Sequence, residues 1–189
     1  MDAHPLTPEQ LNNLDIERLG EPTVDSPLLG QNYQFVKDDQ KVMVYSNSKI
    51  IKKYSDQDRD QYAFEMAGPR KKIYFEPSEL NCGIVTCGGL CPGLNDVIRT
   101  IVLTLTLEYK VNKIYGFKYG YAGMTSDPPA EPLVMNPDMV DEIHLKGGDI
   151  LSSSRGPQSM KDIVDNLQKR NIKLVFAIGG DGTMRGVDD

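Results

Sequence analysis

The chain has 189 residues, a net charge of −6 and an isoelectric point near 5.0. Hydrophobic residues make up 39% of it and charged residues 25%, a balance that excludes a fibrous or wholly disordered protein. The acidic charge argues against nucleic acid as a partner, and no apolar run approaches the ~18 residues that a membrane span needs. The start of the chain lacks the apolar core of a signal peptide, so we expect a cytoplasmic protein.

Residues 1–70 differ in composition from the rest of the chain. Prolines at 5, 8, 22 and 27 interrupt a polar stretch with little periodicity. One helical turn is expected at 7–11, one short strand at 41–45 and a solvated charged run at 56–60. We interpret 1–70 as an N-terminal arm that wraps a neighbouring domain or a partner subunit.

From residue 71 onward, strand patterns alternate with helix patterns. Strands are expected at 82–86, 113–117, 150–151 and 174–178, and the last, which lacks polar alternation, reads as a central strand buried on both faces. Helices are expected at 95–109, from 137 to the glycines at 147–148, and from 160 to 167. This order predicts that 71–189 is an α/β domain with a doubly wound, mostly parallel, Rossmann-like sheet.

Three loops rich in glycine or serine, 88–93, 152–157 and 179–183, each follow an expected strand. Ligands of parallel sheets bind at the carboxyl ends of the strands, so we expect the three loops to converge on one ligand. Gly88-Gly89 offers bare amides at a helix start, where phosphate binds. Arg155 offers a planar cation, and Asp181 a carboxylate of the kind that Mg²⁺ takes beside phosphates.

Each of these loops also has a plainer interpretation when it is considered alone. The glycines would permit tight strand–helix packing, Arg155 would pair with a surface carboxylate, and Asp181 would cap the next helix. Together, however, phosphate amides, a guanidinium and a metal carboxylate are the parts that phosphoryl transfer needs.

The cysteines and histidines point away from other chemistries. Cys82, Cys87 and Cys91 match neither a disulfide framework nor a zinc ribbon, so we expect reduced thiols. The alternative is a redox-sensitive thiol at Cys91, which lies in a glycine-rich loop. With only two histidines, His4 and His144, a histidine-dependent nucleophile or a two-histidine metal site is not expected.

The segment from Ile84 to Asn95, followed by Ile98-Arg99, resembles the opening of the phosphofructokinase family. Ser154-Arg155-Gly156-Pro157 and the Gly-Gly-Asp-Gly-Thr segment at 179–183 match later motifs of that family in the same order. Thr86-Cys87-Gly88-Gly89-Leu90-Cys91 resembles the ATP-dependent branch of plants and trypanosomatid protists. The resemblance covers about 67 to 186, and it extends to 1–66 only in that this branch carries an N-terminal extension.

The resemblance implies a 6-phosphofructokinase that transfers phosphate from Mg-ATP to fructose 6-phosphate, in the cytoplasm or a glycosome, as a homo-oligomer. Arg155 would act catalytically by contacting the γ-phosphate, and Asp181 would hold Mg²⁺. Glycine at 182, where pyrophosphate-using relatives carry Asp, would favour ATP as the donor. The residues that the resemblance assigns to ATP are Gly89, Arg155, Gly156, Gly180, Asp181, Gly182 and Thr183.

The chain departs from the family pattern at its end. The family's catalytic base, in a Thr-Ile-Asp-Asn-Asp motif, and its sugar-phosphate site lie beyond residue 189, so we expect 1–189 alone to be inactive. The alternative is a truncated, non-catalytic protein that binds nucleotide or associates with full-length subunits. NAD kinases and lipid kinases share the 179–183 motif but do not combine it with the two upstream loops.

Overall fold

The computed structural model describes residues 14, 16–45, 47–48 and 62–188. The chain divides into two compact units, 1–74 and 75–189, and each is described by itself. The boundary expected from composition, after residue 70, lies slightly earlier. The helical turn expected at 7–11 and the charged run at 56–60 lie outside the described residues.

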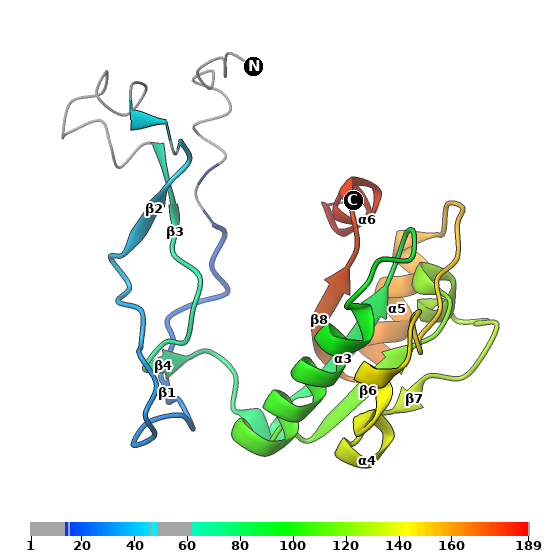
Figure 1. Ribbon diagram of the computed structural model, residues 1–189, viewed down its shortest axis with the longest axis horizontal. Coiled ribbons are helices and arrows are strands. Elements are labelled where there is room, and N and C mark those ends of the chain that lie inside the picture. The colour runs from blue at the N-terminus through cyan, green and yellow to red at the C-terminus, as the bar shows by residue number, and fades with distance from the viewer. Residues whose placement is uncertain (1–13, 15, 46, 49–61, 189) are drawn as a thin grey trace. The chain divides into compact units, whose positions relative to one another are not determined.

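The first unit contains two short antiparallel strand pairs (Figure 1). Strand β1 (Val24–Asp25) pairs with β4 (Lys72–Ile73), and β2 (Lys41–Met43) pairs with β3 (Ala63–Glu65). The side chain of Arg70, only 17% exposed, donates to the backbone oxygens of Lys37 and Met66 at 2.6 Å and to the Glu65 carboxylate at 3.0 Å. A charge-assisted hydrogen-bond network therefore joins segments that have little regular structure.

The second unit is built on a four-stranded sheet in which β5 (Asn81–Thr86) lies between β6 (Lys113–Phe117) and β8 (Ile172–Ile178), with β7 (Leu133–Val134) beyond β6. Strand β5 pairs in parallel with β6 on one side and with β8 on the other, and β7 runs antiparallel to β6. This mostly parallel sheet confirms the expected Rossmann-like α/β fold.

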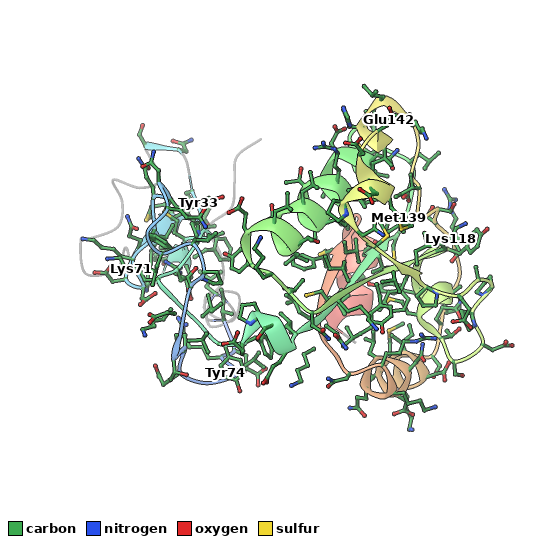
Figure 2. The ribbon with its side chains drawn as sticks, turned by 90° about the horizontal axis from the view of Figure 1, so that it is seen from below. Tyr33, Lys71, Tyr74, Lys118, Met139 and Glu142 are labelled. Carbon is green, nitrogen blue, oxygen red and sulfur yellow. The ribbon has the colours of Figure 1, made fainter. Side chains whose placement is uncertain are left out.

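Helices cover both faces of this sheet because successive side chains of β5 point to opposite sides. Ile84 packs in one core with Ile98 and Val102 of α3 (Leu94–Leu103). Val85 packs in a second core with Phe117 and with Ile163 of α5 (Met160–Lys169). Figure 2 shows α3 and α4 (Pro137–Val140) on one side of the sheet and α5 on the other. The sheet is therefore doubly wound.

Two strand predictions need correction. Residues 150–151 form a turn and not a strand, because the Asp149 carboxylate accepts the Leu151 N–H at 2.8 Å and the Asp149 carbonyl accepts the Ser152 N–H at 3.1 Å. Strand β8, expected at the centre, is the edge of the described sheet, and most of its residues are half-buried. The central strand that is buried along its whole length is β5.

The predicted helices lie where they were expected, but two of them end earlier and are followed by π-helical or 3-10 turns. The helix expected at 95–109 is α3 followed by a π-helical turn, η3 (Thr104–Glu108), in which the Tyr109 N–H donates to Thr104 five residues back. The helix expected from 137 ends at Val140 and is followed by a 3-10 turn, η5 (Ile143–Leu145). Further 3-10 turns are η2 (Pro77–Glu79) and η4 (Gly120–Met124), and α6 (Asp181–Asp188) follows β8. Within the described residues, no helix combines the length and apolar character needed to cross a membrane.

Candidate phosphate-binding site

The first loop, 87–93, connects β5 to α3 at the carboxyl end of the sheet. It turns on Gly88 and Gly93, whose φ angles of +89° and +92° are conformations that side chains disfavour. The Cys87 N–H donates to the Ile178 carbonyl at 2.8 Å, so the loop starts beside the end of β8. Gly89 is exposed, and helix α3 starts without a side-chain cap, although the Leu94 N–H donates to the Cys91 carbonyl at 3.4 Å, so the candidate anion contacts are Gly89 and the rest of the first turn.

The second loop, 149–157, is held by two serine side chains, of which one contacts the first loop and the other the segment after β6. The Ser153 hydroxyl donates to the Gly88 carbonyl at 2.7 Å, and the Ser154 hydroxyl donates to the Tyr119 carbonyl at 2.6 Å. The Tyr119 N–H in turn donates to the Leu151 carbonyl at 2.8 Å. The loop therefore reaches the carboxyl end of the sheet, as expected, although no strand precedes it.

The third loop, 179–183, contacts the first loop at Gly179. Any larger residue at this position would displace neighbouring atoms. A Cβ on Gly179 would lie 2.8 Å from the Cys87 carbonyl oxygen and would overlap the Thr183 side chain. Thr183 is buried, and its carbonyl accepts the Tyr121 hydroxyl at 2.6 Å. The first loop is thus in contact with both of the others.

The residues assigned to ATP differ in their exposure. Gly89, Arg155, Gly156, Gly180, Asp181 and Gly182 are exposed, whereas Thr183 is buried beneath its loop. Asp181 is the first residue of α6, and Gly180 and Gly182 have open space where a Cβ would lie. The structure brings their loops together, but among the described residues no hydrogen bond joins Arg155 directly to Asp181.

Sequence reasoning missed the residues that connect these loops. Tyr119 and Tyr121 directly follow β6, so the rule used for the three loops, that ligands lie where strands end, could have found them. Asp149 joins the end of β5 to the second loop, because its carboxylate accepts the Thr86 hydroxyl at 2.6 Å. No pattern in the sequence marks that contact.

The electrostatics of the site do not favour a thiolate. Burial raises the pKa of Cys87, a hydrogen bond from the Tyr121 N–H lowers it by less, and the charge of Asp149 adds a smaller upward contribution. Burial raises the pKa of Tyr121 as well. Cys87 is therefore a protonated thiol at neutral pH, and the exposed groups among the residues assigned to ATP are backbone amides, the Arg155 guanidinium and the Asp181 carboxylate.

Two further features bear on what the site can bind. Within the described part of the chain, no group of three His, Cys, Asp or Glu side chains is placed to hold a metal ion by itself. A cavity of about 460 Å³ lies among α5, β8 and α6, lined mainly by apolar side chains such as Met160, Ile163 and Val175. That lining does not suit phosphate, so the three loops and not this cavity are the candidate phosphate site.

Comparison with known proteins identifies relatives for the whole second unit. The phosphofructokinase family model matches residues 81–189. An ATP-dependent 6-phosphofructokinase of Borreliella burgdorferi is 45% identical over 184 residues, covering 92% of this chain and 40% of its own length. One of Trypanosoma cruzi is 47% identical over 122 residues, covering 65% and 25%. A chloroplastic one of Arabidopsis thaliana is 49% identical over 122 residues, covering 65% and 22%.

The matches cover more of this chain than the motifs did, but only part of the length of each relative. The Borreliella match covers 92% of the chain, so it includes residues of the first unit, beyond the 67–186 segment that carried the resemblance. The chain spans 40% or less of the length of these relatives. A Pichia pastoris phosphofructokinase crystal structure shares the fold with a TM-score of 0.53 at 21% identity, covering 67% of this chain and 15% of its own.

Proposed function

Because the chain belongs to the phosphofructokinase family, we propose that residues 75–189 form the ATP-binding part of an ATP-dependent 6-phosphofructokinase. The reaction is transfer of the γ-phosphoryl group of ATP to fructose 6-phosphate, which gives fructose 1,6-bisphosphate. The observation that carries the proposal is the contact of the first loop with both others, through Ser153–Gly88 and through Gly179 against Cys87.

In this proposal the first two loops bind the donor phosphates. The amide of Gly89 and the first turn of α3 face the nucleotide phosphates, where the helix dipole favours negative charge. Arg155 contacts the γ-phosphate and stabilises the charge that develops during transfer, and Gly156 lines the nucleotide beside it. The exposed guanidinium stands on a loop whose serine hydroxyls are already engaged, so its support is preorganised.

The third loop fits a magnesium ion that is shared with the nucleotide. Mg²⁺ keeps several waters and typically takes one or two carboxylates plus substrate phosphates. A lone exposed carboxylate at Asp181, between glycines with open space, matches that donor set. When bound, the ion would neutralise phosphate charge; Asp181 would hold it, Gly180 and Gly182 would allow the backbone close to the nucleotide, and Thr183 would support the loop from beneath.

The open space at Gly182 supports ATP as the donor. Apart from its two chain neighbours and the backbone of its own helix, no atom lies within 4 Å of the position that a Cβ would take there, so a larger donor has room beside it. An Asp at this position would place a carboxylate beside the α-phosphate of ATP. Charge repulsion and loss of space would then both disfavour ATP relative to pyrophosphate.

The experiment is a calorimetric titration of the 189-residue chain with Mg-ATP and with Mg-pyrophosphate, beside a coupled assay for fructose 1,6-bisphosphate. We expect Mg-ATP to bind more tightly, Arg155→Ala to weaken binding and Arg99→Ala, which removes an equal charge from α3, to leave it unchanged. We expect no product from 1–189 alone, because the chain spans 40% or less of its relatives. Absence of Mg-ATP binding, or equal binding by Arg155→Ala, would refute the assignment.

A further inference from the structure

Asp149 lies where the end of β5 meets the second loop, and both of its carboxylate oxygens accept hydrogen bonds. Oδ2 accepts from the Thr86 hydroxyl at 2.6 Å, and Oδ1 accepts from the Leu151 N–H at 2.8 Å. Thr86 is 1% exposed and Leu151 is fully buried, so both donors belong to the core. One side chain therefore anchors the start of the loop that carries Arg155 to the central strand.

The backbone on both sides of this anchor is in conformations that need support. Ser152 has a φ of +57° and Tyr119 a φ of +67°, left-handed values that cost free energy in residues other than glycine. The two segments are bound to each other, because the Tyr119 N–H donates to Leu151 and the Ser154 hydroxyl donates to Tyr119. Such a pair persists only when surrounding contacts hold it.

We propose that Asp149 is a positioning residue, which fixes the second loop on β5 so that Arg155 and the Ser153–Gly88 contact are set for a phosphate ligand. The phosphate part of this inference rests on the proposed function. The loop-fixing part rests only on the hydrogen bonds described here. Asp149 acts through Thr86 and Leu151 and does not itself touch the nucleotide.

A carboxylate suits this place because it only accepts hydrogen bonds and can take an O–H and an N–H at the same time. The Asp149 carboxylate lies near the proposed phosphate site, where its negative charge opposes the binding of an anion. We therefore infer that the carboxylate is present for its two hydrogen bonds. Asparagine would keep the bond from Leu151 through its carbonyl oxygen. Its amide would face the Thr86 hydroxyl, which has an alternative acceptor in the Ser152 carbonyl at 3.3 Å.

The test compares Asp149→Ala and Asp149→Asn with Asp127→Ala and Asp127→Asn, matched changes at an exposed carboxylate of the same unit. Amide hydrogen exchange is measured on the free 189-residue chain, and Mg-ATP affinity is measured by titration. For Asp149→Ala we expect exchange at 152–156 to rise at least tenfold with little change in α5, and Mg-ATP affinity to fall about tenfold. Asp149→Asn should lie between Asp149→Ala and wild type.

Thr86 supplies a second, independent arm of the test. Thr86→Val removes the hydroxyl at similar volume and should reproduce part of the local exchange, whereas Thr86→Ser should retain wild-type behaviour. The effects of Thr86→Val and Asp149→Ala should be less than additive, because each breaks the same bond.

The outcomes separate this inference from the proposed function. If wild type does not bind Mg-ATP, the proposed function fails, and hydrogen exchange alone decides whether Asp149 fixes the loop. Exchange at 152–156 equal to that of Asp127→Ala would overturn the inference, as would a uniform rise across the whole second unit. A local rise in exchange with unchanged Mg-ATP affinity would overturn the link to the phosphate site.

Discussion

Replacing Gly179 by alanine tests the contact that brings the first and third loops together. The added Cβ would lie 2.7 Å from the Thr183 Cβ and 2.8 Å from the Cys87 carbonyl oxygen, both under the 3.0 Å that real Cβ contacts keep. The carbonyl is backbone, and the N–H of the same residue is bonded to Ile178 at 2.8 Å, so it cannot yield freely. We expect Gly179→Ala to lower the free energy of unfolding by about 1–3 kcal/mol.

The same change should weaken ligand binding, because relief of the overlap moves the start of α6 away from β5. We expect Mg-ATP affinity to fall by about tenfold, which corresponds to ~1.4 kcal/mol. Urea unfolding gives the stability change and calorimetric titration gives the affinity.

Gly182→Ala is the matched control for Gly179→Ala. Its Cβ would meet nothing within 4 Å, and the residue lies in α6, so alanine should stabilise by about 0.5–1 kcal/mol. A urea midpoint for Gly179→Ala at or above that of wild type would refute the steric reasoning.

Three further predictions follow from single side chains. Asp181→Ala should abolish most of the gain in ATP affinity that Mg²⁺ provides; an undiminished Mg²⁺ effect in calorimetry would remove Asp181 from the metal site. Gly182→Asp should weaken ATP binding at least tenfold, or about 1.4 kcal/mol, and unchanged ATP affinity would show that donor choice is set elsewhere. Burial raises the pKa of Cys82 from its ordinary 9.0 to about 11, so the folded thiol keeps a proton that the unfolded thiol releases. Stability from this group is complete below pH 9 and is lost as the pH rises through 11, and Cys82→Ala should flatten that decline in urea midpoints; an equally steep decline in the variant would assign it to other groups.

The sequence predicted the strands whose ends are marked by glycine, but it could not order them. The apolar run at 174–178 indicates that its side chains are covered by helices. It does not indicate whether the strand has a neighbouring strand on one side or on both sides. Strand β5 is central and fully buried although it contains Asn81 and Gly83, because neighbours from both sides cover it. Position in a sheet depends on partners that are distant in the sequence.

The candidate site was predictable where it depends on local backbone and not where it depends on tertiary hydrogen bonds. Glycines and serines indicated all three loops, although only the first and third follow a strand. The turn at 149–152 looked like a strand because Ile150-Leu151 is apolar, while the decisive donor to Asp149, the Thr86 hydroxyl, lies 63 positions away. Side chains that connect loops in this way leave no periodic signal.

The placement of β8 beside β5 also has a kinetic consequence. Strands β5 and β6 are joined by one helical crossover, so they can associate through contacts that are short in sequence. Strand β8 can pair with β5 only after the much longer segment between them has formed a closed loop. The entropy lost in closing that loop slows the pairing. Since Cys87 contacts Ile178 and Gly179 only after β8 has paired with β5, we expect the proposed nucleotide site to form last during folding.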